Sequence, residues 1–157
     1  TGCGAIAVSL ALELTGVTVF AVDISAEALR FAGINCRRHG TLDRVLLLQG
    51  DMLSALPAPA DIILANLPYV RVADLAVAGA LGEPLLALDG GTDGLDGIRR
   101  LCAKLPGRLQ AGGHLVLEVG AGQAGTVRDM LRELFPRGVI RQLTDLGGIE
   151  RVICLDL

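Results

Sequence analysis

The sequence predicts an α/β fold with a doubly wound, mostly parallel sheet whose two faces are covered by helices. Short apolar runs rich in β-branched residues alternate along the chain with longer segments of helical periodicity. Parallel strands need a long crossover between them, usually a helix, so this alternation is typical of a parallel sheet. The 157 residues suffice for one domain with a buried core, and no repeat or low-complexity linker divides them.

Apolar patterning places the individual elements. Strands are expected at residues 17–22, 45–49, 61–65, 114–119, 139–143 and 151–155. Helices are expected at residues 4–14, 26–38, 95–109 and 123–135. The first helix also alternates at period two, but its length and its glycine-rich start favour a helix. Ser25 is placed to cap the second helix, and Glu27 lies in its first turn, where the helix dipole favours an acid.

The connections between elements carry further information. Only residues 144–150 join the last two predicted strands, too few for a parallel crossover, so this pair should be antiparallel. The longest irregular stretch, residues 70–92, is a candidate active-site loop. Thr1-Gly2-Cys3-Gly4 has the pattern of a strand-to-helix turn whose strand is missing. We therefore expect a further, central strand to precede this chain.

Composition excludes several classes of protein. Hydrophobic residues make up 52% of the chain and charged residues 20%, a balance typical of globular proteins and not of disordered ones. A net charge of −3 and a scarcity of aromatic residues argue against a dedicated nucleic-acid-binding surface. The sequence has no signal peptide or membrane-length apolar run, and its four cysteines include no Cys-x-x-Cys pair. We expect a cytoplasmic protein with no metal site and no disulfide framework.

The tetrapeptide Asn66-Leu67-Pro68-Tyr69 follows the strand predicted at residues 61–65. The Asn66 side-chain oxygen and a nearby main-chain carbonyl can accept both hydrogens of a planar NH2 group, while Tyr69 covers its flat face. Pro68 biases Leu67 toward an extended conformation. This arrangement suits an enzyme that methylates an amide or an exocyclic amine, although an ordinary strand-to-loop turn is also compatible with the four residues.

Glycines and acids follow neighbouring predicted strands at the same edge of the sheet. Gly2 and Gly4 precede a helix, so the backbone there can approach a ligand closely while helix amides stay free. Asp23 ends the next strand, about 20 residues beyond the glycines, where an acid accepts hydrogens from ribose hydroxyls. Asp51 follows the strand at residues 45–49 and is placed to accept from an adenine amino group. Each acid alone is compatible with a turn or a cap, but together they favour an adenosine-containing ligand.

A dinucleotide and S-adenosylmethionine are both candidate ligands. A dinucleotide site prefers Gly-x-Gly-x-x-Gly, whose third glycine is Ala7 here, a replacement that the pattern tolerates. The tetrapeptide at residues 66–69 discriminates between the two, because hydride chemistry does not need it. S-adenosylmethionine has no pyrophosphate and carries a methyl group ready for a nitrogen acceptor, so it fits better.

With these residues identified, the chain resembles class I S-adenosylmethionine-dependent methyltransferases with an Asn-Pro-Pro-Tyr-type motif. More narrowly, it resembles the release-factor glutamine methyltransferases (the HemK/PrmC family). The narrower resemblance spans essentially all residues and rests on Glu83-Pro84, residues 87–96, residues 109–120 with Gln123, and residues 145–152. It implies a Rossmann-like methyltransferase catalytic domain over residues 1–157.

The resemblance also implies an activity and a set of site residues. The expected reaction transfers a methyl group from S-adenosylmethionine to the side-chain amide nitrogen (N5) of the glutamine in the Gly-Gly-Gln motif of peptide-chain release factors. Catalytic roles are implied for Asn66, Pro68 and Tyr69, and Leu67 joins them in binding the substrate. The residues implied to bind the cofactor are Thr1, Gly2, Gly4, Asp23, Asp51 and Asn66.

The chain departs from the family pattern in three respects. Leu67 replaces a proline, a mild change because the accepting carbonyl belongs to the backbone. The family's first strand and its helical domain, which helps to bind the release factor, are not in this sequence, so an inactive fragment is one alternative. A nucleic-acid amino-methyltransferase and a nicotinamide-binding oxidoreductase domain are the others. The former should carry a basic surface, and the latter should retain a pyridine dinucleotide.

Overall fold

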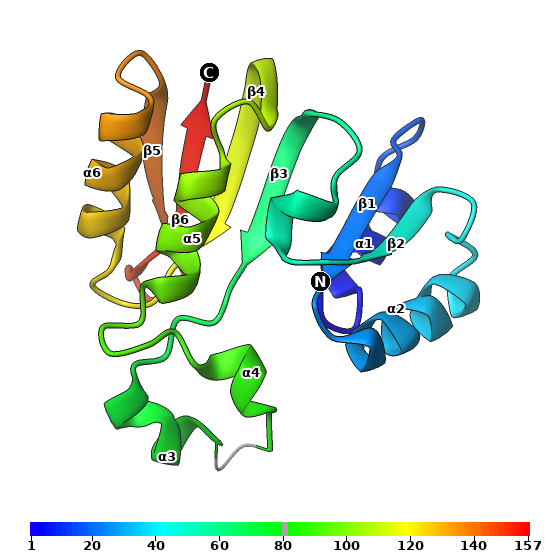
Figure 1. Cartoon of the computed structure of the whole chain (residues 1–157), viewed down its shortest axis with the longest axis horizontal. Coiled ribbons are helices and arrows are strands. Elements are labelled where there is room, and N and C mark those ends of the chain that lie inside the picture. The colour runs from blue at the N-terminus through cyan, green and yellow to red at the C-terminus, as the bar shows by residue number, and fades with distance from the viewer. Residues whose placement is uncertain (80–81) are drawn as a thin grey trace. The chain divides into compact units, whose positions relative to one another are not determined.

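The computed structural model describes residues 1–79 and 82–157, which form two compact units, Thr1–Ala58 and Pro59–Leu157 (Figure 1). Each unit has its own sheet with its own helices. No helix within the described residues is long and apolar enough to cross a membrane.

The first unit contains a two-stranded parallel sheet. β1 and β2 pair from Val19 opposite Val45 to Asp23 opposite Gln49, so both strands end at the same edge. The elements in chain order are α1 (Ala5–Glu13), β1 (Val19–Asp23), α2 (Ala26–Arg38), β2 (Val45–Gln49) and the short 3-10 helix η1 (Met52–Ala55).

Small side chains allow close packing in the first unit, whose core is formed by Ala7, Val8, Ala11, Ala21, Cys36 and Val45. Gly4 precedes α1 with a φ of 81°, and a Cβ there would lie 3.0 Å from the Cβ of Ala32 in α2. Glycine at this position therefore lets the start of α1 lie directly against α2. Ser25 caps α2 as predicted, because its Oγ accepts a hydrogen bond from the backbone N–H of Ala28 at 3.1 Å.

The second unit is built on a four-stranded sheet in the order β3-β4-β6-β5. β3 and β4 are parallel, whereas β6 runs antiparallel to both β4 and β5. The strands are β3 (Ala60–Asn66), β4 (Leu109–Glu118), β5 (Val139–Thr144) and β6 (Glu150–Asp156). The helices are η2 (Val72–Asp74), α3 (Leu75–Ala78), α4 (Leu85–Leu88), α5 (Asp96–Lys104) and α6 (Ala124–Leu134).

Helices α5 and α6 contact each other and supply the helical side of the core of the second unit (Figure 1). Alternate residues of the central strands are fully buried because side chains of a strand point to opposite faces. The fully buried large side chains are Ile98, Leu101 and Leu105 near α5, Val127 and Leu131 in α6, and Leu115, Leu117, Val119, Ile153 and Leu155 in or next to the strands.

The sequence-based expectations are largely confirmed. The α/β class, the parallel pairings, the helical state of α1 and the antiparallel final pair are all present. The helix at 26–38 and the strand at 45–49 have the predicted bounds, and most other elements differ from their predicted bounds by one or two residues.

Three expectations need correction. The helix expected at residues 95–109 ends at Lys104, because Pro106 has no backbone N–H to continue the helical hydrogen bonds and Gly107 adopts a φ of 73°. The strand expected at residues 114–119 begins earlier, at Leu109, through an irregularity in its pairing with β3. The stretch 70–92 is not wholly irregular, since it contains η2, α3 and α4, and its residues 80–81 lie outside the described part.

Candidate active site

The glycine turn and Asp23 meet at the carboxyl edge of β1 in the first unit. Asp23 Oδ2 accepts hydrogen bonds from the Thr1 backbone nitrogen at 2.9 Å and from the Gly2 N–H at 2.8 Å. Its Oδ1 accepts from the Ser25 N–H at 2.8 Å. Burial acts to raise the pKa of Asp23, and the hydrogen bonds from the Ser25 and Gly2 N–H groups act to lower it. Asp23 therefore fixes the turn beside the end of its strand as a carboxylate.

Asp51 belongs to the same edge. The Gly50 N–H donates to the Asp23 backbone carbonyl at 3.0 Å, which joins the ends of β1 and β2. Asp51 follows directly and is the residue before η1, with a half-buried side chain. The structure thus brings Thr1, Gly2, Asp23 and the segment of Asp51 to one edge, while Gly4 is used in packing against α2.

Asn66 and Tyr69 converge on one carboxylate in the second unit. Asn66 is the last residue of β3 and lies opposite Glu118, the last residue of β4. The Asn66 Nδ2 donates to Glu118 Oε2 at 2.9 Å, and the Tyr69 hydroxyl donates to Glu118 Oε1 at 2.9 Å. Burial raises the pKa of the Tyr69 phenol above its ordinary value, and the hydrogen bond to Glu118 raises it further. Tyr69 is therefore a hydrogen-bond donor at neutral pH.

Gln123, the residue before α6, holds the backbone of the tetrapeptide. Its Nε2 donates to the Tyr69 carbonyl oxygen at 3.1 Å and to the Gly94 carbonyl oxygen at 3.3 Å. Its Oε1 accepts from the Gly120 N–H at 2.8 Å. One side chain thus connects the corner after β3, the glycine-rich segment before α5 and the turn after β4.

The glycine-rich segment at residues 89–96 lies against the same corner. Val70 forms a parallel bridge with Asp89, and the Gly90 N–H donates to the Val70 carbonyl at 2.8 Å. Asp93 accepts from the Arg99 guanidinium and from the Leu95 N–H, and the bond from Arg99 lowers the pKa of Asp93 to about 2. The segment is therefore a set of fixed turns that supports the tetrapeptide.

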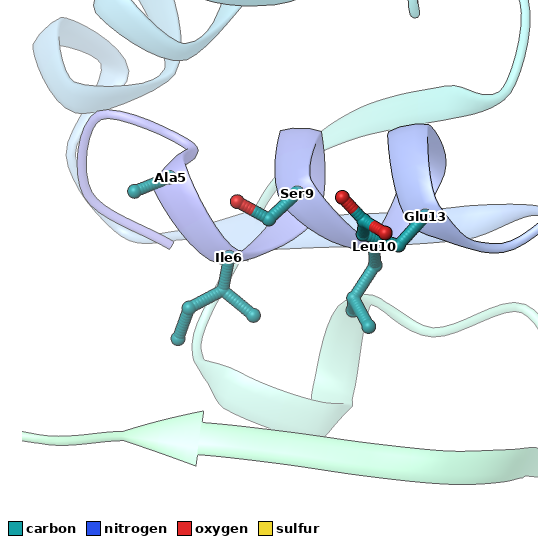
Figure 2. A pocket seen from close by; sticks show the side chains of 5 residues that line it. All are labelled: Ala5, Ile6, Ser9, Leu10 and Glu13. Carbon is teal, nitrogen blue, oxygen red and sulfur yellow. The ribbon is translucent and has the colours of Figure 1, made fainter.

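A pocket of about 310 Å³ adjoins this corner, and Tyr69, Gln123, Arg71 and Arg151 are among its lining residues. Another pocket, of about 340 Å³, lies along α1 (Figure 2), where Ile6 and Leu10 point to the same side of the helix. No residue predicted for the active site lines this second pocket. The pocket beside Tyr69 is therefore the one that the chemistry of the tetrapeptide favours.

The arrangement can hold a planar NH2 group. A carboxylate only accepts hydrogen bonds, so the Asn66 amide must turn its NH2 toward Glu118. Its Oδ1 lies in the same plane but points away from Glu118, so it can accept a hydrogen from a substrate. Asn66 is exposed at the end of its strand, and Leu67, Pro68 and Tyr69 are half-buried.

Glu118 and Gln123 contact the tetrapeptide directly, although their roles could not be assigned from the sequence alone. Both residues lie in segments on which the family resemblance rests, and that resemblance is the sequence signal that could have identified them. Glu83 lies in an exposed position before α4, and its charge is the smallest of the influences on the pKa of Tyr69, which it acts to raise. The roles predicted for the site residues in catalysis and cofactor binding stay predictions.

Comparison with known proteins gives consistent results. A family model described as "Methyltransferase small domain" matches residues 1–87. The chain is 46% identical to the release factor glutamine methyltransferase of Gloeobacter violaceus over 157 residues, which cover 98% of the chain and 55% of that protein. It is 44% identical to the protein of the same name from Moorella thermoacetica, over 96% of the chain and 54% of that protein.

A third relative carries a different name. The ribosomal protein uL3 glutamine methyltransferase of Bordetella pertussis is 47% identical over 126 residues, 76% of the chain and 41% of that protein. The chain spans about half the length of the release factor glutamine methyltransferases that it matches.

Solved structures agree on the fold. A methyltransferase from Pyrococcus furiosus superposes with a TM-score of 0.72 at 15% identity, covering 99% of the chain and 71% of that structure. A ribosomal protein L11 methylase from Lactobacillus delbrueckii superposes with a TM-score of 0.69 at 20% identity, covering 99% of the chain and 64% of that structure. The predicted Rossmann-like fold is therefore confirmed for the chain as a whole.

Proposed function

This chain belongs to the methyltransferase small domain family and matches release factor glutamine methyltransferases over almost its whole length, and from this premise we propose its reaction. The proposed reaction is transfer of a methyl group from S-adenosylmethionine to the side-chain amide nitrogen of the glutamine in the Gly-Gly-Gln motif of peptide-chain release factors. Residues 1–157 are the catalytic domain in this proposal. The resemblance identified from the sequence motifs is confirmed by the named relatives.

The observation that carries the proposal is the fixed orientation of the Asn66 amide. Its NH2 group is bonded to Glu118, so Oδ1 serves as an acceptor for one amide hydrogen of the substrate glutamine. The Leu67 carbonyl serves as the acceptor for the other hydrogen. With both hydrogens held in the amide plane, the nitrogen presents its face to the methyl donor.

Positioning supplies most of the catalysis in this scheme. An amide nitrogen is a poor nucleophile because its lone pair is delocalised into the carbonyl. Holding the reactants in line is worth an effective molarity of roughly 10⁵–10⁸ M. The substrate nitrogen would take the methyl group that the sulfonium of S-adenosylmethionine supplies, leaving the thioether S-adenosylhomocysteine, and would then release one proton to solvent. Tyr69 packs against the glutamine side chain and shapes the methyl-transfer site.

The first unit supplies the residues that would hold the cofactor, whose sulfonium provides the methyl group. Asp23 ends β1 with Oδ1 accepting one hydrogen, from Ser25, within the described residues. A carboxylate oxygen can accept two hydrogens, so the donor set around Asp23 fits a ribose hydroxyl as well. In this proposal Thr1, Gly2 and Gly4 lie beside the methionine part, Asp51 accepts from the adenine amino group, and Asn66 contributes near the methyl group.

Replacing Asp23 with asparagine is expected to weaken cofactor binding about tenfold to a hundredfold. Hydrogen bonds to a charged acceptor are worth roughly 1.5–3 kcal/mol, and the amide NH2 of asparagine would face the Gly2 or Ser25 N–H that Asp23 now binds. Calorimetric titration with S-adenosylhomocysteine measures the effect. Asp43→Asn, an exposed acid of the same unit, is the matched control. Equal affinities for the Asp23 and Asp43 variants would remove Asp23 from the cofactor site.

Methyl transfer from labelled S-adenosylmethionine to a purified release factor tests the proposed reaction. The full-length protein is expected to label the Gly-Gly-Gln glutamine, and a release factor with that glutamine substituted should stay unlabelled. Absence of label on the unsubstituted release factor, despite bound cofactor, would refute the substrate assignment.

A second candidate substrate follows from one relative. The protein from Bordetella pertussis is named for a glutamine of ribosomal protein uL3, another protein amide. Purified uL3 therefore belongs in the same assay as an alternative acceptor. The relatives named above are all protein glutamine methyltransferases, so a nucleic-acid amine and a nicotinamide reaction are not favoured. We place the reaction in the cytoplasm, consistent with four free cysteines.

A further inference from the structure

We propose that Glu118 is a positioning residue, which selects the reactive orientation of the Asn66 amide and simultaneously anchors the Tyr69 ring. This inference rests on the proposed function, because it concerns the same amide-binding site. The observation behind it is that both carboxylate oxygens are engaged, Oε2 by Asn66 and Oε1 by Tyr69, each at 2.9 Å.

The carboxylate determines which end of the Asn66 amide meets the substrate. An asparagine side chain can rotate by half a turn, which exchanges its accepting oxygen and its donating NH2 group. The reversed orientation would point N–H groups at the N–H groups of the substrate glutamine and would also place Oδ1 against the Glu118 carboxylate. A carboxylate partner excludes that state because it offers no hydrogen to Oδ1. The amide is therefore fixed before the substrate arrives.

Glu118 is itself held firmly. Leu117 and Val119 on either side are completely buried, and Glu118 pairs with Asn66 on one neighbouring strand and with Val152 on the other. The Val119 N–H donates to the Arg151 carbonyl at 2.9 Å, which continues the ladder beyond the strand. The carboxylate thus projects from the end of a strand that has a neighbour on each side, whereas Tyr69 lies in the loop after β3. A strand of the sheet therefore supplies the carboxylate that positions the Tyr69 side chain.

The same carboxylate couples the two residues that the substrate would meet. The Tyr69 hydroxyl donates a hydrogen bond to Glu118, and the Tyr69 carbonyl accepts one from Gln123, so the side chain and the backbone of this residue are both held. Loss of Glu118 frees the Asn66 amide and the Tyr69 ring together. Substitution at this one position is therefore expected to act on turnover far more than on binding of the cofactor, whose predicted ligands are mostly in the first unit.

Steady-state kinetics of the full-length protein with a release factor test the proposal. Glu118→Ala is expected to lower kcat roughly tenfold to a hundredfold, since small misplacements in an aligned site have effects of this size. The KM for S-adenosylmethionine should change by less than about threefold. Glu118→Gln should lose less, because its single oxygen can still accept from one of the two donors. Glu133→Gln, on an exposed residue of α6, is the matched control.

A double-mutant cycle separates positioning from a general loss of structure. With Asn66 already replaced by alanine, the amide orientation no longer matters and only the anchoring of Tyr69 remains, so adding Glu118→Ala should reduce kcat by a clearly smaller factor than it does in the wild-type background. An equal fold-loss from Glu118→Ala in both backgrounds would overturn the proposal, as would wild-type kcat in the Glu118→Ala single variant. If the unsubstituted protein labels no release factor, the proposed function itself has failed, and the inference fails with it.

A spectroscopic measurement needs no substrate. In the full-length protein, the difference between alkaline titrations recorded with Tyr69 and with Tyr69→Phe isolates the absorbance of Tyr69, the one tyrosine of these 157 residues. The charged groups that influence the pKa of Tyr69 are Glu118 on β4, Arg151 on β6 and Glu83 before α4. Glu118 acts to raise the phenol pKa, so Glu118→Gln should shift the titration to lower pH, whereas Glu133→Gln should leave it in place. An unchanged titration in Glu118→Gln would show that the carboxylate does not anchor the ring.

Discussion

Replacing Asn66 with alanine is expected to lower kcat for methyl transfer by roughly a hundredfold or more, the largest effect of any single substitution in the proposed site. The variant removes the Oδ1 acceptor and leaves one hydrogen of the substrate amide without a partner. It also leaves the Oε2 of Glu118 without the hydrogen bond that it now accepts at 2.9 Å. Steady-state and single-turnover transfer of labelled methyl groups to the release factor measure the effect.

Two further variants sharpen this result. Asn66→Asp keeps an oxygen of the same shape but places a second carboxylate against Glu118, so it should be as inactive as the alanine variant at neutral pH. Gln110→Ala, which removes an exposed amide side chain of β4, should keep wild-type kcat. Substantial activity in Asn66→Ala would mean that the glutamine amide is bound by another group.

Replacing Gly94 with alanine is expected to impair both folding and turnover. Gly94 has a φ of 79°, and a Cβ there would lie 2.3 Å from the Tyr69 carbonyl oxygen and 2.5 Å from Gln123 Nε2. The backbone of the tetrapeptide would have to move, and the hydrogen bond between those two groups would break. We expect a loss of roughly 2–4 kcal/mol in the free energy of unfolding, from backbone strain and steric overlap together, and a fall in kcat.

Gly148 provides the matched control for this prediction. Its φ is 77°, nearly the same as that of Gly94, but a Cβ there would have no atom within 4 Å. Gly148→Ala therefore carries only the backbone strain, about 1–2 kcal/mol, and should keep its kcat. Denaturant unfolding and methyl-transfer kinetics on both variants separate the two causes. Equal losses of stability with unchanged kcat would show that contact with Tyr69 is unimportant.

The secondary structure that could be predicted depends on local interactions. The α2 helix has a capping serine at Ser25 and an acid in its first turn, and its bounds were predicted correctly. The antiparallel pairing of β5 and β6 followed from the shortness of their connection. By contrast, the helix expected to continue to residue 109 ends at Lys104, because Pro106 and Gly107 interrupt the apolar run there. The short helices in the stretch 70–92 have too few residues for a detectable period.

The sequence by itself determined the fold class and the residue types of the candidate site. The tetrapeptide at residues 66–69 and the acids after two strands carry their chemistry in a few adjacent letters, so pattern alone identifies them. The tertiary structure decided how those residues are oriented. Glu118 lies 52 residues from Asn66, and Gln123 lies 54 residues from Tyr69, yet both pairs are hydrogen-bonded. Such contacts arise only when β4 pairs with β3 and α6 packs on the sheet, because no local pattern encodes a partner that distant.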